Sequence, residues 1–253
     1  QALLRSPAKP PQAVNVVMET TYGDRLHKPL GPSVEELYGA VTDTFKRGGN
    51  VVIPTFALER AQDLLYVLNQ GINQGQLMRS TQVFLDSPMA ISATEVMQHH
   101  LECLQPEIAK LIQEGHDPFH LPGLHYTRET SESVAINKVA GGAIIMAGSG
   151  MCTGGRVRHH LKHNLSRPES SIVFVGYAAI GTLARTIIDG AKEVNVLGEQ
   201  IPVRARIFTI NGFSAHADQA ELLAWQKQTG ARRTILVHGD EDTMRSFATL
   251  LHD

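Results

Sequence analysis

Short apolar runs alternate along this chain with longer amphipathic stretches, and the alternation predicts its secondary structure. Six apolar runs have strand length and end in turn-forming or polar residues: VNVVMET, NVVIPTFA, TQVFLDSP, AIIMAGSG, SSIVFVGY and TILVHGD. Continuous runs of β-branched and apolar residues are typical of strands that are buried on both faces of a parallel sheet. The pattern therefore predicts a mainly parallel sheet.

Helical patterns lie between these runs: SVEELYGAVTDTFKRGG, ERAQDLLYVLNQG, ISATEVMQHHLECL and ESVAINKVAGG. Ser33 and Glu36 have the spacing of a capping box, and Gly48 is placed to end the same helix. Asp218 and Glu221 repeat the capping spacing directly after the sequence NGFSAHA. The order strand, helix, strand, helix predicts an α/β fold, while EVNVLGEQIPVRARIFTI, which alternates on both sides of Gly198, predicts an antiparallel hairpin.

Composition restricts the class of protein more than its function. The 253 residues can bury one large core or two modest ones, and 42% hydrophobic with 19% charged residues is ordinary for a globular protein. A net charge of -2 gives no overall attraction to a polyanion, so any nucleic-acid site must be local. Cys103 and Cys152 lie far apart, which argues against a disulfide framework and favours the cytoplasm. We expect no membrane association, because no apolar run approaches the ~20 residues of a span.

Chemistry-bearing residues follow four strand-like runs, and in open α/β sheets ligands bind at the carboxyl ends of strands. Glu19 follows VNVVM, His216 follows IFTINGFSA, His238 follows TILV, and the glycine-rich sequence GSGMCTGGR follows AIIMA. Each has an ordinary structural explanation when taken alone: a carboxylate that caps a turn, a histidine satisfied in a turn, or glycines that permit positive φ. Together they could form one site.

The glycine-rich sequence predicts an anion site, because a strand, a glycine loop and a helix start can aim backbone N–H groups at a phosphate. Basic residues directly after the loop would add charge, although a solvated helix face explains them equally simply. The expected phosphate-binding residues are Ser149, Gly150, Gly154, Gly155, Arg156, Arg158, His160 and Lys162.

Seven segments in order carry a family resemblance: ETTYGDRLH, IPTFALERAQDLL, FLDSPMA, AGSGMCTGGRVRHHLKHNL, FVGYAAIGTLAR, FSAHAD and LVHGDED. They resemble the successive signature segments of the β-CASP branch of the metallo-β-lactamase-fold hydrolases. That branch includes ribonucleases and the endonuclease subunit of the pre-mRNA cleavage machinery. The resemblance covers nearly the whole chain, from about residue 14 to about residue 245.

The resemblance implies a zinc-dependent RNA phosphodiester hydrolase with two zinc ions in the full-length enzyme. It places the family's acidic motif on Glu19, its general-acid histidine on His216 and a zinc-ligand histidine on His238. A histidine held by a carboxylate has a fixed tautomer and a raised pKa, so that it can protonate a leaving oxygen at neutral pH. Members with histidine rather than valine at the last position tend to act on RNA, so His238 favours RNA as the substrate.

The chain departs from the family in its main metal-binding motif, H-x-H-x-D-H, whose spacing none of the twelve histidines shows. This motif precedes ETTYGDR in the family, and the start at Gln1 without methionine agrees with a fragment. We therefore expect an incomplete zinc site and no activity of this chain alone. The expected organisation is the end of a first metallo-β-lactamase segment over residues 1–23, a β-CASP domain over 24–213 and a returning, incomplete αββα segment over 214–253.

Two other functions remain open. The chain could be a non-catalytic nucleic-acid-binding module in which Glu19, His216 and His238 serve packing. A nucleotide-binding doubly wound domain built around GSGMCTGG fits less well, because this stretch lacks both G-x-G-x-x-G and the Walker lysine. RNA is the expected partner, and a homodimer is left open, as are the choice between endo- and exonuclease and the preferred RNA sequence.

Overall fold

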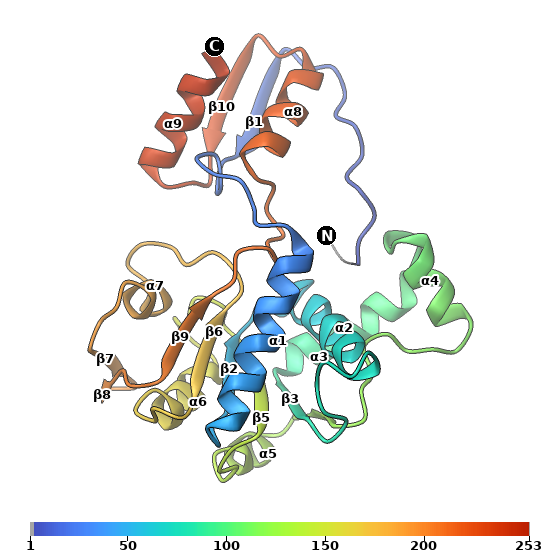
Figure 1. Ribbon diagram of the computed structural model, residues 1–253. Coiled ribbons are helices and arrows are strands. Elements are labelled where there is room, and N and C mark those ends of the chain that lie inside the picture. Colours follow the sequence, from blue (N-terminus) through green and yellow to red (C-terminus); the bar gives the residue numbers. More distant parts are fainter. Residues whose placement is uncertain (1–2, 253) are drawn as a thin grey trace. The chain divides into compact units, whose positions relative to one another are not determined.

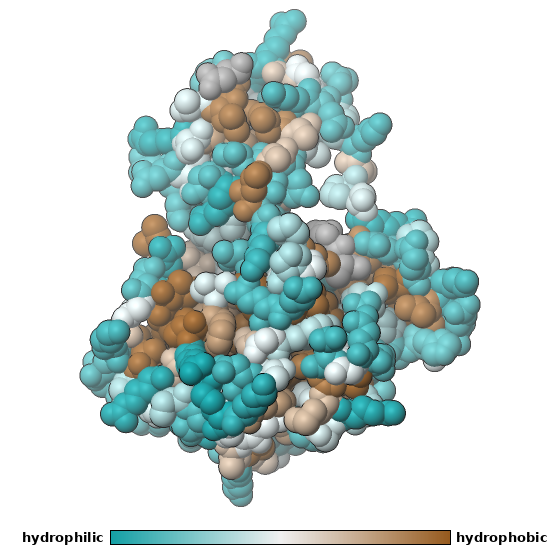
Figure 2. Space-filling view, in the orientation of Figure 1, coloured by the Kyte–Doolittle hydropathy of each residue, from teal (hydrophilic) through white to brown (hydrophobic). Residues whose placement is uncertain are grey.

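The computed structural model describes residues 3–252, which form two compact units. The larger unit contains Pro29–Phe213 and the short segment that ends at Arg5, whereas the smaller contains Ser6–Lys28 and the segment that begins at Ser214. Each unit has hydrophobic core residues of its own. Figure 2 shows mainly hydrophilic residues on the visible face, interrupted by smaller hydrophobic groups.

A six-stranded sheet organises the larger unit, and every neighbouring pair of its strands is parallel. The strand order is β4-β3-β5-β2-β6-β9. The strands are β2 (Val51–Pro54), β3 (Gln82–Asp86), β4 (Leu124–Tyr126), β5 (Ala143–Ala147), β6 (Ser171–Phe174) and β9 (Arg206–Thr209). The predicted α/β class with a mainly parallel sheet is confirmed, and the carboxyl ends of its strands share one edge (Figure 1).

Helices cover both faces of this sheet. Alternate residues of a strand point to opposite faces, so each strand contributes side chains to two cores. Ile144 and Met146 of β5 belong to one core, whereas Ile145 between them belongs to the other. The first face packs against α1 (Leu30–Lys46), α2 (Arg60–Asn73), α3 (Pro88–His99) and α4 (Pro106–Gln113), next to the 3₁₀ turn Leu101–Cys103. The second packs against α5 (Thr130–Ile136), α6 (Val157–Asn164), α7 (Leu183–Ile188) and the hairpin of β7 (Glu193–Val196) and β8 (Glu199–Pro202). This two-sided burial explains the continuous apolar runs of the strands.

The smaller unit is built on a parallel pair of strands, β1 (Asn15–Glu19) and β10 (Arg233–Val237). Val16 and Met18 of β1 pack against Leu222 of α8 (Gln219–Thr229) and Phe247 of α9 (Glu241–His252). The register pairs Glu19 with Val237, so both strands end at the same level. Residues that follow these two strands are therefore brought side by side.

Local signals in the sequence predicted some boundaries well and others poorly. The capping box of Asp218 with Glu221 is present in both directions, at 3.0 Å for each hydrogen bond. Strands β7 and β8 pair antiparallel around Gly198 as expected, but the end of the same predicted stretch forms β9, which pairs parallel with β6 instead of joining the hairpin. The box expected of Ser33 with Glu36 is wrong, because α1 begins at Leu30 and the Ser33 hydroxyl instead donates to the Pro29 carbonyl. Proline is tolerated in a first helical turn, which lets the helix start earlier.

Several elements lay outside the predicted pattern because their apolar periodicity is short. Strand β4 has three residues and helix α4 has eight, too few to stand out from a loop. Cys103 and Cys152 are both free. Within the described residues, no helix combines the length and the apolar character that crossing a membrane requires. The expected location in the cytoplasm stays a prediction.

Candidate functional site

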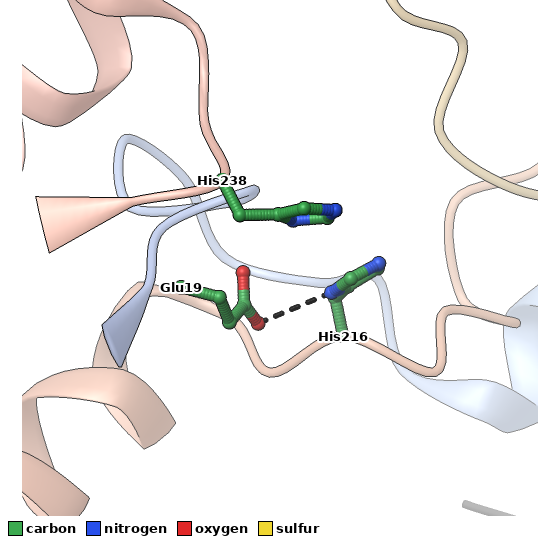
Figure 3. Close-up of side chains that lie close together, drawn as sticks. All are labelled: Glu19, His216 and His238. Carbon is green, nitrogen blue, oxygen red and sulfur yellow. Dashed lines mark ion pairs between the residues drawn. The ribbon is translucent and has the colours of Figure 1, made fainter. Parts of the chain in front are cut away.

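Glu19, His216 and His238 come together at one end of the smaller unit (Figure 3). Glu19 is the last residue of β1, and His238 directly follows its paired strand β10. His216 lies in the turn before α8, where its N–H donates to the Ser214 hydroxyl at 3.1 Å. The ring Nε2 of His27 is 2.9 Å from the His216 carbonyl and ties this turn down from a second loop. Residues nearly 200 positions apart in the sequence thus meet in one cluster.

Glu19 and His216 form an ion pair, with 3.2 Å between Glu19 Oε1 and His216 Nδ1. This distance is within the hydrogen-bonding reach expected from the sequence. The other carboxylate oxygen of Glu19 accepts from the Thr21 backbone N–H at 2.6 Å. Burial opposes ionisation of Glu19, but the hydrogen bonds from His216 and Thr21 outweigh it and lower the pKa of Glu19. The carboxylate therefore stays ionised and holds the imidazole of His216 by its Nδ1.

The imidazole of His238 stacks on that of His216, with ring centroids 5.3 Å apart and an interplanar angle of 28°. His238 has φ of 50°, a left-handed conformation that is uncommon for a residue other than glycine. The next residue, Gly239, must be small, because a Cβ there would lie 2.6 Å from the Thr20 hydroxyl oxygen. Strained backbone that the surroundings hold in place is frequent at functional sites, which is consistent with a role for this histidine.

The donor atoms of this cluster suit a zinc ion. One carboxylate oxygen and two imidazole nitrogens are ordinary zinc ligands, and these atoms of Glu19, His216 and His238 all lie within 4.8 Å of one another. Within the described residues this is the one such group of histidine, cysteine and acidic side chains. The geometry permits two arrangements: all three side chains bind metal, or His238 binds it while Glu19 and His216 remain a hydrogen-bonded pair.

Thr21 is a member of this site that sequence reasoning missed. Its side chain is buried, and its hydroxyl lies 3.1 Å from His238 Nδ1 and 3.4 Å from His216 Nδ1. The signal was present, since a hydroxyl two residues after a strand-end carboxylate can turn back toward the same site. Hydroxyl residues are common in turns, however, and their usual partner is the nearby backbone.

The glycine loop after β5 forms a tight turn in the larger unit. The Ser149 hydroxyl accepts from the Gly154 N–H at 3.3 Å, and Gly155 has φ of 76°. A Cβ at Gly155 would lie 2.3 Å from the Gly148 carbonyl oxygen, and one at Gly150 would lie 2.7 Å from the ring of Phe56. Close packing within the loop therefore requires glycine at 150 and 155, and phosphate binding by the loop backbone stays a prediction.

Two of the predicted phosphate ligands are instead part of a buried network around Asp86, at the end of β3. His160 is fully buried, and its Nε2 lies 2.6 Å from Asp86 Oδ2. Arg156 donates to Asp86 Oδ1 at 2.8 Å and to the carbonyls of Thr127 and Arg128. The prediction that His160 contacts phosphate directly is therefore wrong, because its side chain is fully buried against Asp86. The guanidinium of Arg156 uses both of its terminal nitrogens for hydrogen bonds within the protein.

Asp86 is the residue that organises this network. Burial opposes its ionisation, but hydrogen bonds from His160, Ser133, Thr127 and Arg156 lower the pKa of Asp86 to about 2. A buried carboxylate is costly unless it is paired and hydrogen-bonded, and Asp86 has both kinds of partner. In the sequence, FLDSP is a predicted strand end and part of a family segment, but no role was assigned to Asp86, so the partner of the basic residues was missed.

The remaining predicted phosphate ligands on α6 are Lys162 and Arg158, and only Lys162 has an ion-pair partner among the described residues. Lys162 Nζ lies 2.5 Å from Glu199 Oε1 of the hairpin, and both side chains are partly exposed. The Nε of Arg158 is buried and has no hydrogen-bond partner within the described residues. Phosphate contacts by Lys162 and Arg158 stay predictions, and the Lys162 contact would have to compete with a carboxylate.

Comparisons with known proteins agree with the arrangement of the fold. Residues 61–187 match the Beta-Casp domain, which covers about half of the chain. Residues 200–253 match a domain described as the Zn-dependent metallo-hydrolase RNA specificity domain. The second match contains His216 and His238, whereas the first contains the glycine loop and α6.

Curated relatives cover nearly the whole of this chain. It is similar to ribonuclease TTHA0252 of Thermus thermophilus, with 41% identity over 98% of this chain and 57% of the relative. Similarity to the transcription termination factor FttA of Methanocaldococcus jannaschii is 34% over 94% of this chain and 39% of the relative. An RNase J-like protein of the same organism is 34% identical over 92% of this chain and 53% of the relative.

The chain therefore spans between about two fifths and three fifths of the length of these relatives. A mainly parallel sheet flanked by helices, a matching Beta-Casp domain and a similar protein named as a ribonuclease all support the same family. The chain belongs to the β-CASP family of metallo-β-lactamase-fold RNA-processing hydrolases.

Proposed function

We propose that the protein to which this chain belongs is a zinc-dependent RNA phosphodiester hydrolase. One observation carries the proposal: the Glu19–His216 ion pair lies beside the imidazole of His238, with donor atoms that fit a metal ion. The match to a Zn-dependent metallo-hydrolase RNA specificity domain over residues 200–253 supports zinc and RNA. The relatives named ribonuclease and RNase J-like protein support hydrolysis of RNA.

His216 is the proposed general acid. Its Nδ1 is paired with the Glu19 carboxylate, which fixes the tautomer and stabilises the protonated ring. Nε2 is then the nitrogen that carries the transferable proton to the leaving 3′-oxygen of the cleaved phosphodiester. The lowered pKa of Glu19 supports this role, because the carboxylate keeps its charge at neutral pH.

His238 is the proposed zinc ligand. When bound, zinc supplies Lewis-acid stabilisation of a phosphoryl oxygen and activates a water. Neither Glu19 nor His216 is required as a ligand in this division of roles, so the two can act together on the proton. A single imidazole binds zinc weakly, and a catalytic zinc ion takes about three protein ligands. We propose that the other ligands of a two-zinc centre come from residues outside these 253, so that this chain alone is inactive.

We also propose a domain assignment for the two units. The smaller unit, made of Ser6–Lys28 and the segment that begins at Ser214, would be part of an αββα metallo-β-lactamase domain, and the larger unit would be the inserted β-CASP domain. The boundary expected at residues 23 and 24 then moves to Lys28 and Pro29, and the segment that ends at Arg5 goes with the larger unit. RNA would contact the backbone of the loop formed by Ser149, Gly150, Gly154 and Gly155. The tight packing at Gly150 and Gly155 supports a fixed loop, which suits recognition of a phosphate by backbone N–H groups.

Histidine substitutions in the full-length protein test the proposal. His238→Ala should reduce the zinc content, whereas His216→Ala should keep the zinc and lower RNA cleavage by about 10²–10⁴-fold. His159→Ala, which removes an exposed histidine of α6, is the matched control and should leave both quantities unchanged. Zinc is measured by elemental analysis, and cleavage with a labelled single-stranded RNA.

The outcomes separate the two functions considered from the sequence. Wild-type protein that binds RNA without zinc and without cleavage would establish the non-catalytic module instead. Stoichiometric zinc or metal-dependent cleavage by the 253-residue chain would show that its ligand set is more complete than proposed. Loss of zinc in His216→Ala would show that His216 is a metal ligand and not the proton donor proposed here.

A further inference from the structure

Thr21 makes more contacts within the candidate site than any role as a turn residue requires. Its backbone N–H donates to Glu19 Oε2 at 2.6 Å, which fixes the carboxylate. Its hydroxyl oxygen lies 3.2 Å from the His238 carbonyl oxygen, 3.1 Å from the Nδ1 of the same residue and 3.4 Å from His216 Nδ1. The side chain is buried, at 3% exposure, so these partners are not exchanged freely for water.

One arrangement of hydrogens accounts for both contacts of the Thr21 hydroxyl with His238. A hydroxyl has one hydrogen to donate and two lone pairs to accept with, whereas a carbonyl can only accept. If the hydroxyl donates to the His238 carbonyl, its contact with His238 Nδ1 can be a hydrogen bond only when Nδ1 carries the proton. Both contacts are then satisfied at once, and the unprotonated nitrogen of neutral His238 is Nε2.

The backbone at His238 adds an independent reason for this arrangement. The left-handed φ of 50° turns the chain directly after β10, and the Thr21 hydroxyl holds the carbonyl of that turn. One side chain thus fixes both the backbone and the ring of His238. Because the imidazole also stacks on His216, its rotation is restricted from two sides.

We propose that Thr21 is a positioning residue that holds His238 in the tautomer with the proton on Nδ1, so that Nε2 keeps its lone pair for a metal ion. The proposal rests on the proposed function, in which His238 is the metal ligand. Partners of this kind on the second nitrogen of a ligand histidine set its tautomer and orientation. Thr21 touches no substrate in this proposal and acts through His238.

The neighbouring residue Thr20 provides a matched control. It is also a buried threonine, at 0% exposure, and its hydroxyl donates to the Val237 carbonyl at 3.1 Å. Thr20→Val and Thr21→Val therefore each remove one buried hydroxyl near the end of β10. We expect the imidazole of His238 to respond to the second substitution and not to the first.

Nitrogen-15 NMR of histidine-labelled 253-residue chain reads the tautomer directly, without metal and without activity. Measured where the rings are neutral, wild type, Thr20→Val and Thr21→Ser should show the proton of His238 on Nδ1. Thr21→Val should move the proton to Nε2 or give a mixture. Titration of the same samples with Zn²⁺ should show an apparent Kd raised about 10–100-fold in Thr21→Val. Thr21→Ser should restore most of the lost affinity.

The proposal is overturned if wild-type His238 carries its proton on Nε2, a result that needs no variant to fold. It is also overturned if Thr21→Val leaves the tautomer and the Zn²⁺ affinity unchanged, or if Thr20→Val changes the tautomer equally. Failure of the proposed function is distinguishable, because full-length protein without RNA cleavage would contradict the hydrolase while the tautomer of His238 still reports on Thr21.

Discussion

The two strand-end clusters of this protein carry similar signals in the sequence and have different structures. In the smaller unit, Glu19, His216 and His238 turn toward one another and stay partly exposed or exposed to solvent. In the larger unit, three of the basic residues predicted to bind phosphate have acidic partners within the protein. His160 and Arg156 bind the buried Asp86, and Lys162 pairs with Glu199.

The difference shows that a basic cluster near a glycine loop does not define a phosphate site until its internal partners are known. Asp86 is fully buried, and a buried carboxylate needs compensating charge and hydrogen bonds. The nearest basic side chains meet that need. In the smaller unit the single carboxylate, Glu19, has one histidine as its charged partner, and His238 remains available beside it.

The largest expected effect tests whether Glu19 acts through His216. In the full-length protein, Glu19→Gln should lower RNA cleavage about 10²-fold, because the imidazole loses the charge that orients and stabilises it. The double variant Glu19→Gln/His216→Ala should be no slower than His216→Ala, since two residues that act as a unit are not additive. Single-turnover cleavage rates measure both. Additive losses would show that Glu19 has a separate role, such as metal binding.

A smaller but still large effect is expected on the stability of the larger unit. Asp86→Asn should lower the free energy of unfolding by about 3 kcal/mol, because the buried His160 and the partly exposed Arg156 lose their charged partner. Asp189→Asn is the control, since it removes an exposed ion pair with Arg185 and should cost less than ~1 kcal/mol. Urea unfolding measures both variants. If Asp86→Asn lowered the free energy of unfolding no more than Asp189→Asn does, the structural role assigned to Asp86 would be contradicted.

The stability difference between wild type and Asp86→Asn should depend on pH. The pKa of Asp86 is lowered from 3.8 to about 2, so in wild type the folded state binds this proton less readily than the unfolded state. The stabilisation is therefore complete above the unfolded value and is lost as pH falls toward about 2. Urea midpoints of the two proteins should converge as the pH is lowered through this range. A constant difference would place the effect in packing rather than in charge.

The smallest effect is expected at Lys162. Its partner Glu199 is exposed, and exposed ion pairs contribute at most about 1 kcal/mol. A phosphate can compete with such a partner, so Lys162→Ala should weaken RNA binding by roughly twofold. The slope of log binding constant against log salt concentration should fall by less than the amount expected for one phosphate contact. Glu199→Gln should strengthen binding by a similar factor. If Lys162→Ala weakened RNA binding tenfold or more, Lys162 would be a main phosphate ligand, contrary to this expectation.

Much of the fold could be predicted because its signals are local and repeated. The continuous apolar runs of β2, β5 and β6 reflect burial on both faces, and the capping box of Asp218 with Glu221 depends on residues three apart. The start of α1 and the short strand β4 could not be predicted in the same way. Their boundaries depend on packing against neighbours that a local window does not contain.

By itself the sequence determined the α/β class, the family resemblance and the identity of Glu19, His216 and His238 as candidates, because these depend on residue types in order along the chain. Tertiary structure decided which candidates meet. Parallel pairing of β1 with β10 placed Glu19 level with Val237, and the turn at His238 then brought Thr21 into contact with its ring. Pairing across more than 200 residues leaves no periodic trace in either segment, and the burial of Asp86 likewise fixed the partners of Arg156 and His160 from a distant strand.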